Sequence, residues 1–191
     1  MPAGVWLIRH GETAWTRSGA HTGRTDIPLT GQGRLEAAGL ARLLAGHPFA
    51  LVLTSPMQRA IETCRLSGCA AASQIEPNLR EWDYGDYEGI TTPQIHQARP
   101  GWSLWADGVP NGETVDEVGR RADAVIQRAL AAGGDVALFA HGHLLRILTA
   151  RWLGLLPEAG RLFALGTATV SQLGYERETR VITRWNLSAW A

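Results

Sequence analysis

Histidine and arginine side chains stand at or just after the ends of three short apolar runs in this chain. Arg9 and His10 follow the first run, Arg59 comes soon after the second and His141 follows the third. Phosphoryl transfer through histidine needs a neutral imidazole nitrogen aimed at phosphorus, cations around the phosphate oxygens and an acid for the leaving oxygen. We therefore interpret His10 as a candidate nucleophile and the other three residues as a candidate phosphate pocket.

The arginines have two expected effects at such a site. Their planar guanidinium groups present several N–H donors to phosphate oxygens. Their charge would also lower the pKa of His10, because a protonated imidazole would be a like charge beside Arg9 and Arg59. His141 can supply a further donor or cation, and the helix predicted after Ser55 would add N–H groups and a favourable dipole.

Four carboxylates compete for the role of the acid, namely Glu81, Asp83, Asp86 and Glu88. Glu81 is preferred because its aromatic neighbours would disfavour the ionised form and keep a proton available. Chemistry alone does not separate the four.

The apolar runs at 5–8, 50–54 and 136–140 are too short for helices and bulky enough for buried strands. Helical patterns separate them. Strands that alternate with helices favour an α/β fold with three α/β/α layers and a mostly parallel central sheet. Because ligands bind outside the carboxyl ends of parallel strands, the candidate residues are expected to meet at one edge of the sheet.

Capping residues mark the starts of the predicted helices. Thr30 is the expected N-cap of a helix that ends near Gly46, and Ser55 with Pro56 begins a second. Thr114, with a glutamate three residues later, begins the most regular helix. A fourth follows His141, and the tail from 169 to 185 alternates enough for two more strands. From about 77 to 113 the pattern breaks down into pieces rich in Trp, Tyr, Gly and Pro, which predicts long loops over the strand ends.

Composition limits the class of protein. The chain has 191 residues, 45% of them hydrophobic, which suffices for one domain over residues 1–191. The formal net charge of +0 gives no electrostatic reason to bind nucleic acid or a membrane. All 18 cations are arginines, which excludes lysine chemistry. The two cysteines are too few for a disulfide framework and no apolar run reaches membrane length, so a cytoplasmic protein is expected. A homo-oligomer is compatible with the sequence.

Four ordered motifs carry a family resemblance: Arg9-His10-Gly11-Glu12-Thr13, Ser55-Pro56-x-x-Arg59-Ala60-x-x-Thr63, Glu81-x-x-Tyr84-Gly85 and His141-Gly142. Together they resemble the histidine phosphatase superfamily, with its phosphoglycerate mutase-like fold. The resemblance implies that His10 becomes the phosphohistidine, that Arg9, Arg59 and His141 surround the phosphate, and that Glu81 is the proton donor. It also implies that neither a metal nor another cofactor is needed.

A finer resemblance rests on the segments 21–30, 80–89, 111–114 and 141–143. These are similar to the branch that holds sedoheptulose-bisphosphatase-like enzymes and broad-specificity acid phosphatases. The resemblance and the loop positions give a set of candidate substrate-binding residues. They are Thr16, His21, Thr22, Gly23, Tyr84, Gly142 and His143.

Three functions remain to be weighed. Hydrolysis of a small phosphomonoester, plausibly a sugar phosphate, is favoured over a phosphomutase, because Arg99 is the only cation between Gly85 and Glu113. Thr16 and His143 also stand where many mutases of the family carry asparagine. A catalytically inactive phosphate-binding or protein-interaction module is the third reading, yet none of the catalytic motif residues is missing. The spacing of His141 and His143 could suggest zinc, but no matching third ligand lies nearby in the sequence.

Overall fold

The computed structural model describes residues 4–189, so the outermost ends of the predicted domain lie outside the described residues. Six strands form one sheet in the order β3-β2-β4-β1-β5-β6. Strands β1 to β4 are mutually parallel, β5 runs antiparallel to β1, and β6 pairs antiparallel with β5 at the edge of the sheet. The expectation of a mostly parallel sheet is thus confirmed. The strands are β1 Val5–Arg9, β2 Leu51–Thr54, β3 Ser73–Ile75, β4 Val136–Ala140, β5 Thr169–Glu176 and β6 Thr179–Ser188.

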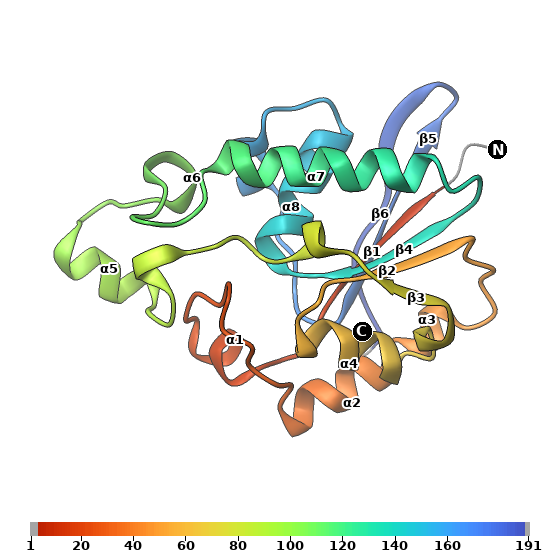
Figure 1. Cartoon of the computed structure of the whole chain (residues 1–191), viewed down its shortest axis with the longest axis horizontal. Coiled ribbons are helices and arrows are strands. Elements are labelled where there is room, and N and C mark those ends of the chain that lie inside the picture. Colours follow the sequence, from red (N-terminus) through yellow and green to blue (C-terminus); the bar gives the residue numbers. More distant parts are fainter. Residues whose placement is uncertain (1–3, 190–191) are drawn as a thin grey trace.

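Helices cover both faces of the sheet, as Figure 1 shows. On one face, α7 (Val115–Leu130) and α8 (Gly142–Trp152) pack against side chains such as Leu7 and Leu138. On the other, α2 (Gly31–Gly39), α3 (Ala41–Leu44) and α4 (Gln58–Leu66) cover Ile8 and Phe139. Successive residues of a strand point to opposite faces, so the fully apolar β4 is buried on both. The three predicted layers are therefore confirmed.

Two helix predictions were wrong in detail. The helix expected from Thr30 to about Gly46 is divided at Leu40, whose N–H bonds to the carbonyl of Ala37 three residues back and tightens the turn. The helix expected to begin at Pro56, with Ser55 as its N-cap, begins two residues later, at Gln58. The Ser55 hydroxyl lies against His141 and accepts from the Met57 N–H, so it does not cap the helix.

The irregular excursion from about 77 to 113 contains more helix than the sequence indicated. It holds α5 (Thr92–Ala98), α6 (Leu104–Asp107) and the 3₁₀ turns Pro77–Leu79 and Gly85–Tyr87. Thr91 and Gln94 form a capping box at the start of α5, with Pro93 in its first turn. The remaining short elements are α1 (Ala14–Ser18) and the 3₁₀ turns Ala70–Ala72 and Pro157–Leu162. Within 4–189, no helix is long and apolar enough to cross a membrane.

Candidate active site

A pocket of about 290 Å³ opens where the parallel strands end. This volume is at the small end of the range for ligand sites, which suits a small molecule. Nine of the twelve candidate site residues line it: Arg9, His10, Thr16, His21, Thr22, Glu81, Tyr84, Gly142 and His143. The three that do not are Gly23, Arg59 and His141.

Neighbouring strands bring the key residues together. Arg9 is the last residue of β1 and pairs with Ala140, the last residue of β4, and the N–H of His10 donates to the Ala140 carbonyl at 3.1 Å. His10 and His141 thus leave the sheet side by side, with ring centroids 5.1 Å apart. The predicted meeting of distant segments at one sheet edge is confirmed.

His10 is held as a neutral base with one free nitrogen. Its Nδ1 lies 2.8 Å from the carbonyl oxygen of Gly11. Since a carbonyl only accepts, Nδ1 carries the proton and Nε2 keeps its lone pair. Burial lowers the pKa of His10 well below its ordinary value, and the charges of Arg59 and Arg9 lower it further. Burial is therefore a larger cause of the lowered pKa than the two arginines, which were the only cause predicted from the sequence.

Arg9 is a buried cation with spare hydrogen-bonding capacity in the pocket. Its Nη1 donates to the carbonyl of Leu165, while its buried Nε has no partner among the described residues. Burial lowers the pKa of Arg9, and the nearby carboxylate of Glu81 opposes that shift. A buried guanidinium N–H without a partner is uncommon and is the kind of group that an oxyanion would satisfy.

Arg59 and His141 lie behind the pocket. Arg59 is fully buried in the first turn of α4, as predicted, and its Nη groups donate to the carbonyls of Thr22, Gly23 and Thr25. Its Nε donates to Nδ1 of His141 at 3.2 Å, and Nε2 of His141 lies 2.7 Å from the Ser55 hydroxyl.

His141 is therefore neutral in this arrangement, with both ring nitrogens engaged. Burial, followed by the charge of Arg59, lowers the pKa of His141 well below its ordinary value. The alternative that His141 acts as a cation is not what the geometry favours. The start of α4 likewise has no free N–H at Gln58, which donates to the carboxylate of Asp26.

Among the four acidic candidates, only Glu81 lines the pocket with His10. Asp83 pairs with Arg24, Asp86 accepts from the Asn111 side chain, and Glu88 accepts from the N–H groups of Gly23 and Thr25. Three carboxylates thus have structural partners elsewhere.

The setting of the Glu81 carboxylate differs from the aromatic one expected. Its Oε1 accepts from the N–H groups of Trp82 and Leu144 at 2.9 Å, and its Oε2 accepts from the N–H of His143 at 3.0 Å. The first turn of α8 therefore fixes the direction of this carboxylate.

A family model described as histidine phosphatase superfamily (branch 1) matches residues 5–188. The chain belongs to the histidine phosphatase superfamily. It is 40% identical to an acid phosphatase of Mycobacterium tuberculosis over 91% of this chain and 87% of that protein. It is 34% identical to a sedoheptulose 1,7-bisphosphatase of Saccharomyces cerevisiae over 78% of this chain and 67% of that protein. Other relatives, at lower identity, are named probable phosphoglycerate mutases.

Solved structures of this superfamily share the whole architecture. A functionally characterised open reading frame product of Mycobacterium tuberculosis superposes with a TM-score of 0.94 at 38% identity. The match covers 99% of this chain and 100% of that one. The phosphoglycerate mutase-like fold of this histidine phosphatase is therefore established.

At the far end of the pocket, Tyr84 and His143 form a neutral hydrogen-bonded pair. Burial raises the pKa of Tyr84 well above its ordinary value, so the phenol keeps its proton and donates to Nδ1 of His143 over 2.6 Å. Burial also lowers the pKa of His143, with the charge of Arg146 as the next cause. Nε2 of His143 then carries an N–H that can donate to a ligand. The ring of His21 packs against that of Tyr84 in a tilted arrangement, with centroids 4.8 Å apart.

Sequence reasoning missed one cation of this histidine phosphatase. Arg146 lines the pocket, donates to the carbonyls of Gly160 and Arg161 and stacks 4.7 Å above the ring of Trp105. It lies three residues after His143 on α8, and residues at that spacing share one helix face. This spacing was the available signal. Gly19, Ala20, Thr92 and Leu165 complete the lining.

Glycines set how closely the segments of this histidine phosphatase approach one another. A Cβ on Gly23 would lie 2.4 Å from the carbonyl oxygen of Trp82, so this position admits only glycine. Thr22 beside it donates to the Ala20 carbonyl, and Thr16 caps α1 together with Thr13. Among the described residues, no group of three His, Cys, Asp or Glu side chains could hold a metal ion.

Gly33→Ala is expected to destabilise the protein by about 1–3 kcal/mol, because its Cβ would lie 2.1 Å from the carbonyl oxygen of Glu12. Glu12 follows the His10 turn, so activity would fall as well. Gly31→Ala is the matched control in the same helix, since nothing lies within 4 Å of its Cβ. Thermal melts of both variants test this, and equal melting temperatures would contradict the steric explanation.

Proposed function

We propose that this histidine phosphatase hydrolyses small phosphomonoesters through a phosphohistidine on His10. The observation that carries the proposal is the neutral His10, whose Nε2 is free, beside the unpartnered Nε of Arg9 and the carboxylate of Glu81. A nucleophile, an oxyanion donor and an acid thus border one pocket.

In the first step, Nε2 of His10 bonds to phosphorus while the ester P–O bond breaks. The electron pair goes to the leaving oxygen, which takes a proton from Glu81 and departs as an alcohol. In the second step, water attacks phosphorus and gives a proton to the Glu81 carboxylate. The P–N bond breaks, its electron pair returns to Nε2, and inorganic phosphate is released.

Electrostatic support comes from two arginines in different ways. Arg9 donates directly to the phosphate oxygens from the pocket wall. Arg59 contributes charge from behind, holds the 22–25 backbone and, through His141, orders the floor of the site. Their combined charge favours the dianionic substrate and adds to burial, the larger cause, in keeping His10 unprotonated.

The leaving group is proposed to be polar, as in a sugar phosphate or bisphosphate. The N–H of His143, together with His21, Thr16 and Thr22, offers hydrogen bonds to hydroxyl groups. Arg146 adds a cation at the pocket wall for a second anionic group. The sedoheptulose bisphosphatase among the relatives supports this substrate class.

The alternative function is that of a phosphomutase, because some relatives are named probable phosphoglycerate mutases. Arg99, the one cation of the 85–113 segment, pairs with Asp107 and donates to the Tyr87 hydroxyl, and it does not line the pocket. A phosphoglycerate substrate would therefore lack a cation from this segment, which favours transfer to water. Measuring phosphate release against isomer formation from 3-phosphoglycerate separates the two reactions.

The proposed function is tested by turnover of a panel of sugar phosphates, sugar bisphosphates and an aryl phosphate, with a chelator present. Hydrolysis of at least one class in the presence of the chelator is expected. No turnover of any member would overturn the proposal. The specificity constants then rank the leaving groups.

We also propose a cytoplasmic location, which the two free cysteines support. We further propose one catalytic domain over residues 1–191, which the continuous six-stranded sheet supports.

The acid limb of the pH profile is expected to lie well below pH 6.5. Protonation of His10 would block attack, and its lowered pKa means that the neutral form persists as the pH falls through the ordinary histidine range. The value of kcat/KM for an aryl phosphate, corrected for the titration of the phosphate itself, should stay level there. An acid limb with an apparent pKa at or above 6.5 that belongs to the free enzyme would contradict this.

A further inference from the structure

We propose that Glu113 and Arg121 are positioning residues for the acid Glu81. We name this ion pair the Glu113–Arg121 clasp. The inference rests on the proposed function, because it assumes that Glu81 protonates the leaving group. Neither residue lines the pocket that contains His10, so any effect on the reaction must pass through Glu81.

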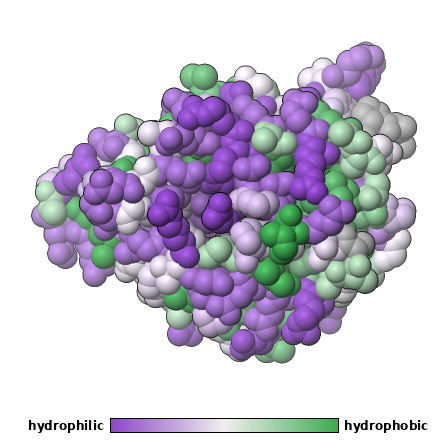
Figure 2. All heavy atoms as spheres, viewed as in Figure 1, coloured by the Kyte–Doolittle hydropathy of each residue, from purple (hydrophilic) through white to green (hydrophobic). Residues whose placement is uncertain are grey.

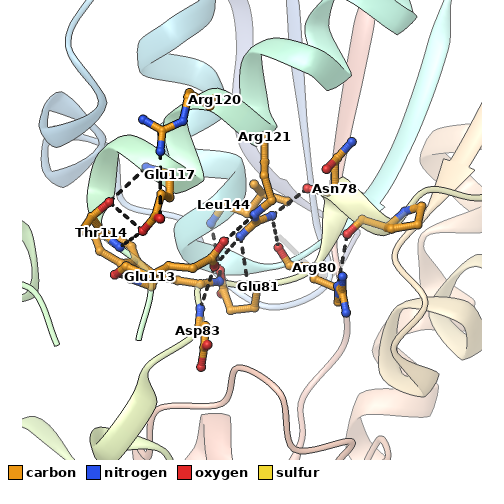
Figure 3. Close-up of polar contacts among 12 residues, drawn as sticks. Asn78, Arg80, Glu81, Asp83, Glu113, Thr114, Glu117, Arg120, Arg121 and Leu144 are labelled. Atoms are coloured by element: carbon orange, nitrogen blue, oxygen red, sulfur yellow. Dashed lines mark hydrogen bonds and ion pairs between the residues drawn. The ribbon is translucent and has the colours of Figure 1, made fainter. Parts of the chain in front are cut away.

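The guanidinium of Arg121 is fully used, and three of its contacts are to the segment that carries Glu81. Nε and Nη2 donate to the two oxygens of Glu113 at 2.7 and 2.8 Å. Nη1 donates to the carbonyls of Asn78 and Arg80, and Nη2 also donates to the carbonyl of Glu81 at 3.3 Å. Each of the five N–H donors therefore has an acceptor. Figure 3 shows Arg121 reaching from α7 to this backbone.

Glu113 holds the same segment on the other side of Glu81. Its Oε2 accepts from the N–H of Asp83 at 3.0 Å, its carbonyl accepts from the indole N–H of Trp82, and its own N–H donates to the Asp83 carbonyl. The clasp thus binds the backbone before, at and after Glu81. Glu113 and Arg121 keep only 23% and 18% of their side chains exposed, so the pair is partly shielded from water.

Glu81 is therefore fixed at two points. The first turn of α8 holds the carboxylate, through the N–H groups of His143 and Leu144, and the clasp holds the backbone. The Arg24–Asp83 pair nearby is a poor substitute, because Arg24 is 79% exposed. Without the clasp, the 78–83 segment would lose its hydrogen bonds to Arg121 and keep only apolar packing on α7, so the proton of Glu81 would be placed less accurately beside the leaving oxygen.

The clasp lies in a second hollow, which Glu81 also borders, together with Arg24, Arg80 and Asp83. The middle of the face drawn in Figure 2 is correspondingly hydrophilic. Two of the three arginines that face this hollow already have partners, because Arg24 pairs with Asp83 and every N–H of Arg121 has an acceptor. This use of the cations favours a positioning role over a second anion site.

The test uses two esters that differ in their need for an acid. Glycerol phosphate has a strongly basic leaving oxygen that needs a proton. The leaving group of 2,4-dinitrophenyl phosphate is a weakly basic phenolate that departs without one. The value of kcat/KM reports the steps up to departure of the leaving group and is insensitive to hydrolysis of the phosphohistidine. Arg121→Lys keeps the positive charge but loses the planar guanidinium that bonds both Glu113 and the backbone. Glu113→Gln is a second variant, which we expect to have a smaller effect. Arg120→Gln, the adjacent and exposed residue of α7, is the matched control.

For Arg121→Lys we expect kcat/KM on glycerol phosphate to fall about ten- to hundredfold. On the dinitrophenyl ester it should fall by less than about threefold, because an acid contributes little there. Glu113→Gln should show the same pattern more weakly, and Arg120→Gln should match the wild type on both esters.

Two results would overturn the inference while leaving the proposed function intact. One is an equal loss on both esters, which would indicate a merely structural role. The other is full activity of both clasp variants on glycerol phosphate. A wild-type protein that hydrolyses neither these esters nor any member of the substrate panel would overturn the proposed function and this inference with it.

Discussion

His10→Ala is expected to lower kcat by about 10⁴–10⁶-fold on every ester, because removing a nucleophile abolishes the covalent route. The two other imidazoles that line the pocket are engaged with Tyr84, because Nδ1 of His143 accepts from its hydroxyl and the ring of His21 packs against its ring. The ring of His10 is buried, and its hydrogen bond within the described residues is to the Gly11 carbonyl. His10→Gln is a second variant that fills more of the space.

Two measurements separate chemistry from folding in these variants. Quenching with denaturant at alkaline pH during turnover should trap a phosphorylated species in the wild type and none in His10→Ala, and the label should be stable to base and lost in acid. Thermal melts establish that the variants are folded. His47→Gln is the matched control, since His47 pairs with Asp135 and lies outside the pocket. Retained hydrolysis or retained labelling in folded His10→Ala would show that another residue is the nucleophile.

Removing the acid is expected to give the second largest effect, and one that depends on the substrate. Glu81→Ala should lower kcat/KM by about 10²–10⁴-fold on an alkyl phosphate, where the leaving oxygen needs a proton. On a dinitrophenyl ester the loss should be much smaller. A plot of log kcat/KM against leaving-group pKa should be steeper for the variant than for the wild type.

The choice of variant matters at this position. Glu81→Gln would turn an NH₂ group toward one of the backbone N–H donors of Trp82, His143 or Leu144, which would disturb the start of α8. Glu81→Ala avoids that clash. Both variants should show the same dependence of kcat/KM on the leaving group. Asp86→Asn is the control, because Asp86 is exposed and bonded to Asn111. Equal losses on both esters, or a loss in Asp86→Asn, would contradict the assignment of the acid.

Much of this site was predictable from the residues that follow the apolar runs. The prediction needs only local sequence patterns and the rule that ligands bind at the carboxyl ends of parallel strands. The apolar runs before His10 and His141 are short and bulky, and the ends of β1 and β4 meet, since parallel neighbours share a direction. The cap at Thr114 was also predicted, because Thr114 and Glu117 bind each other within one turn. The capping box of α5 is equally local and was passed over amid the Trp- and Gly-rich surroundings.

What the sequence by itself determined is therefore the residue types of the site, their order and the sheet edge at which they gather. Only the tertiary structure decided that Arg59 and His141 stand behind the pocket, that Arg146 enters it, and that Arg121 binds the backbone of Glu81. The physical reason is sequence distance. Arg59 and His141 are 82 residues apart, and Arg121 and Glu81 are 40 apart. Such contacts follow from how helices pack on the sheet, and no local pattern encodes them.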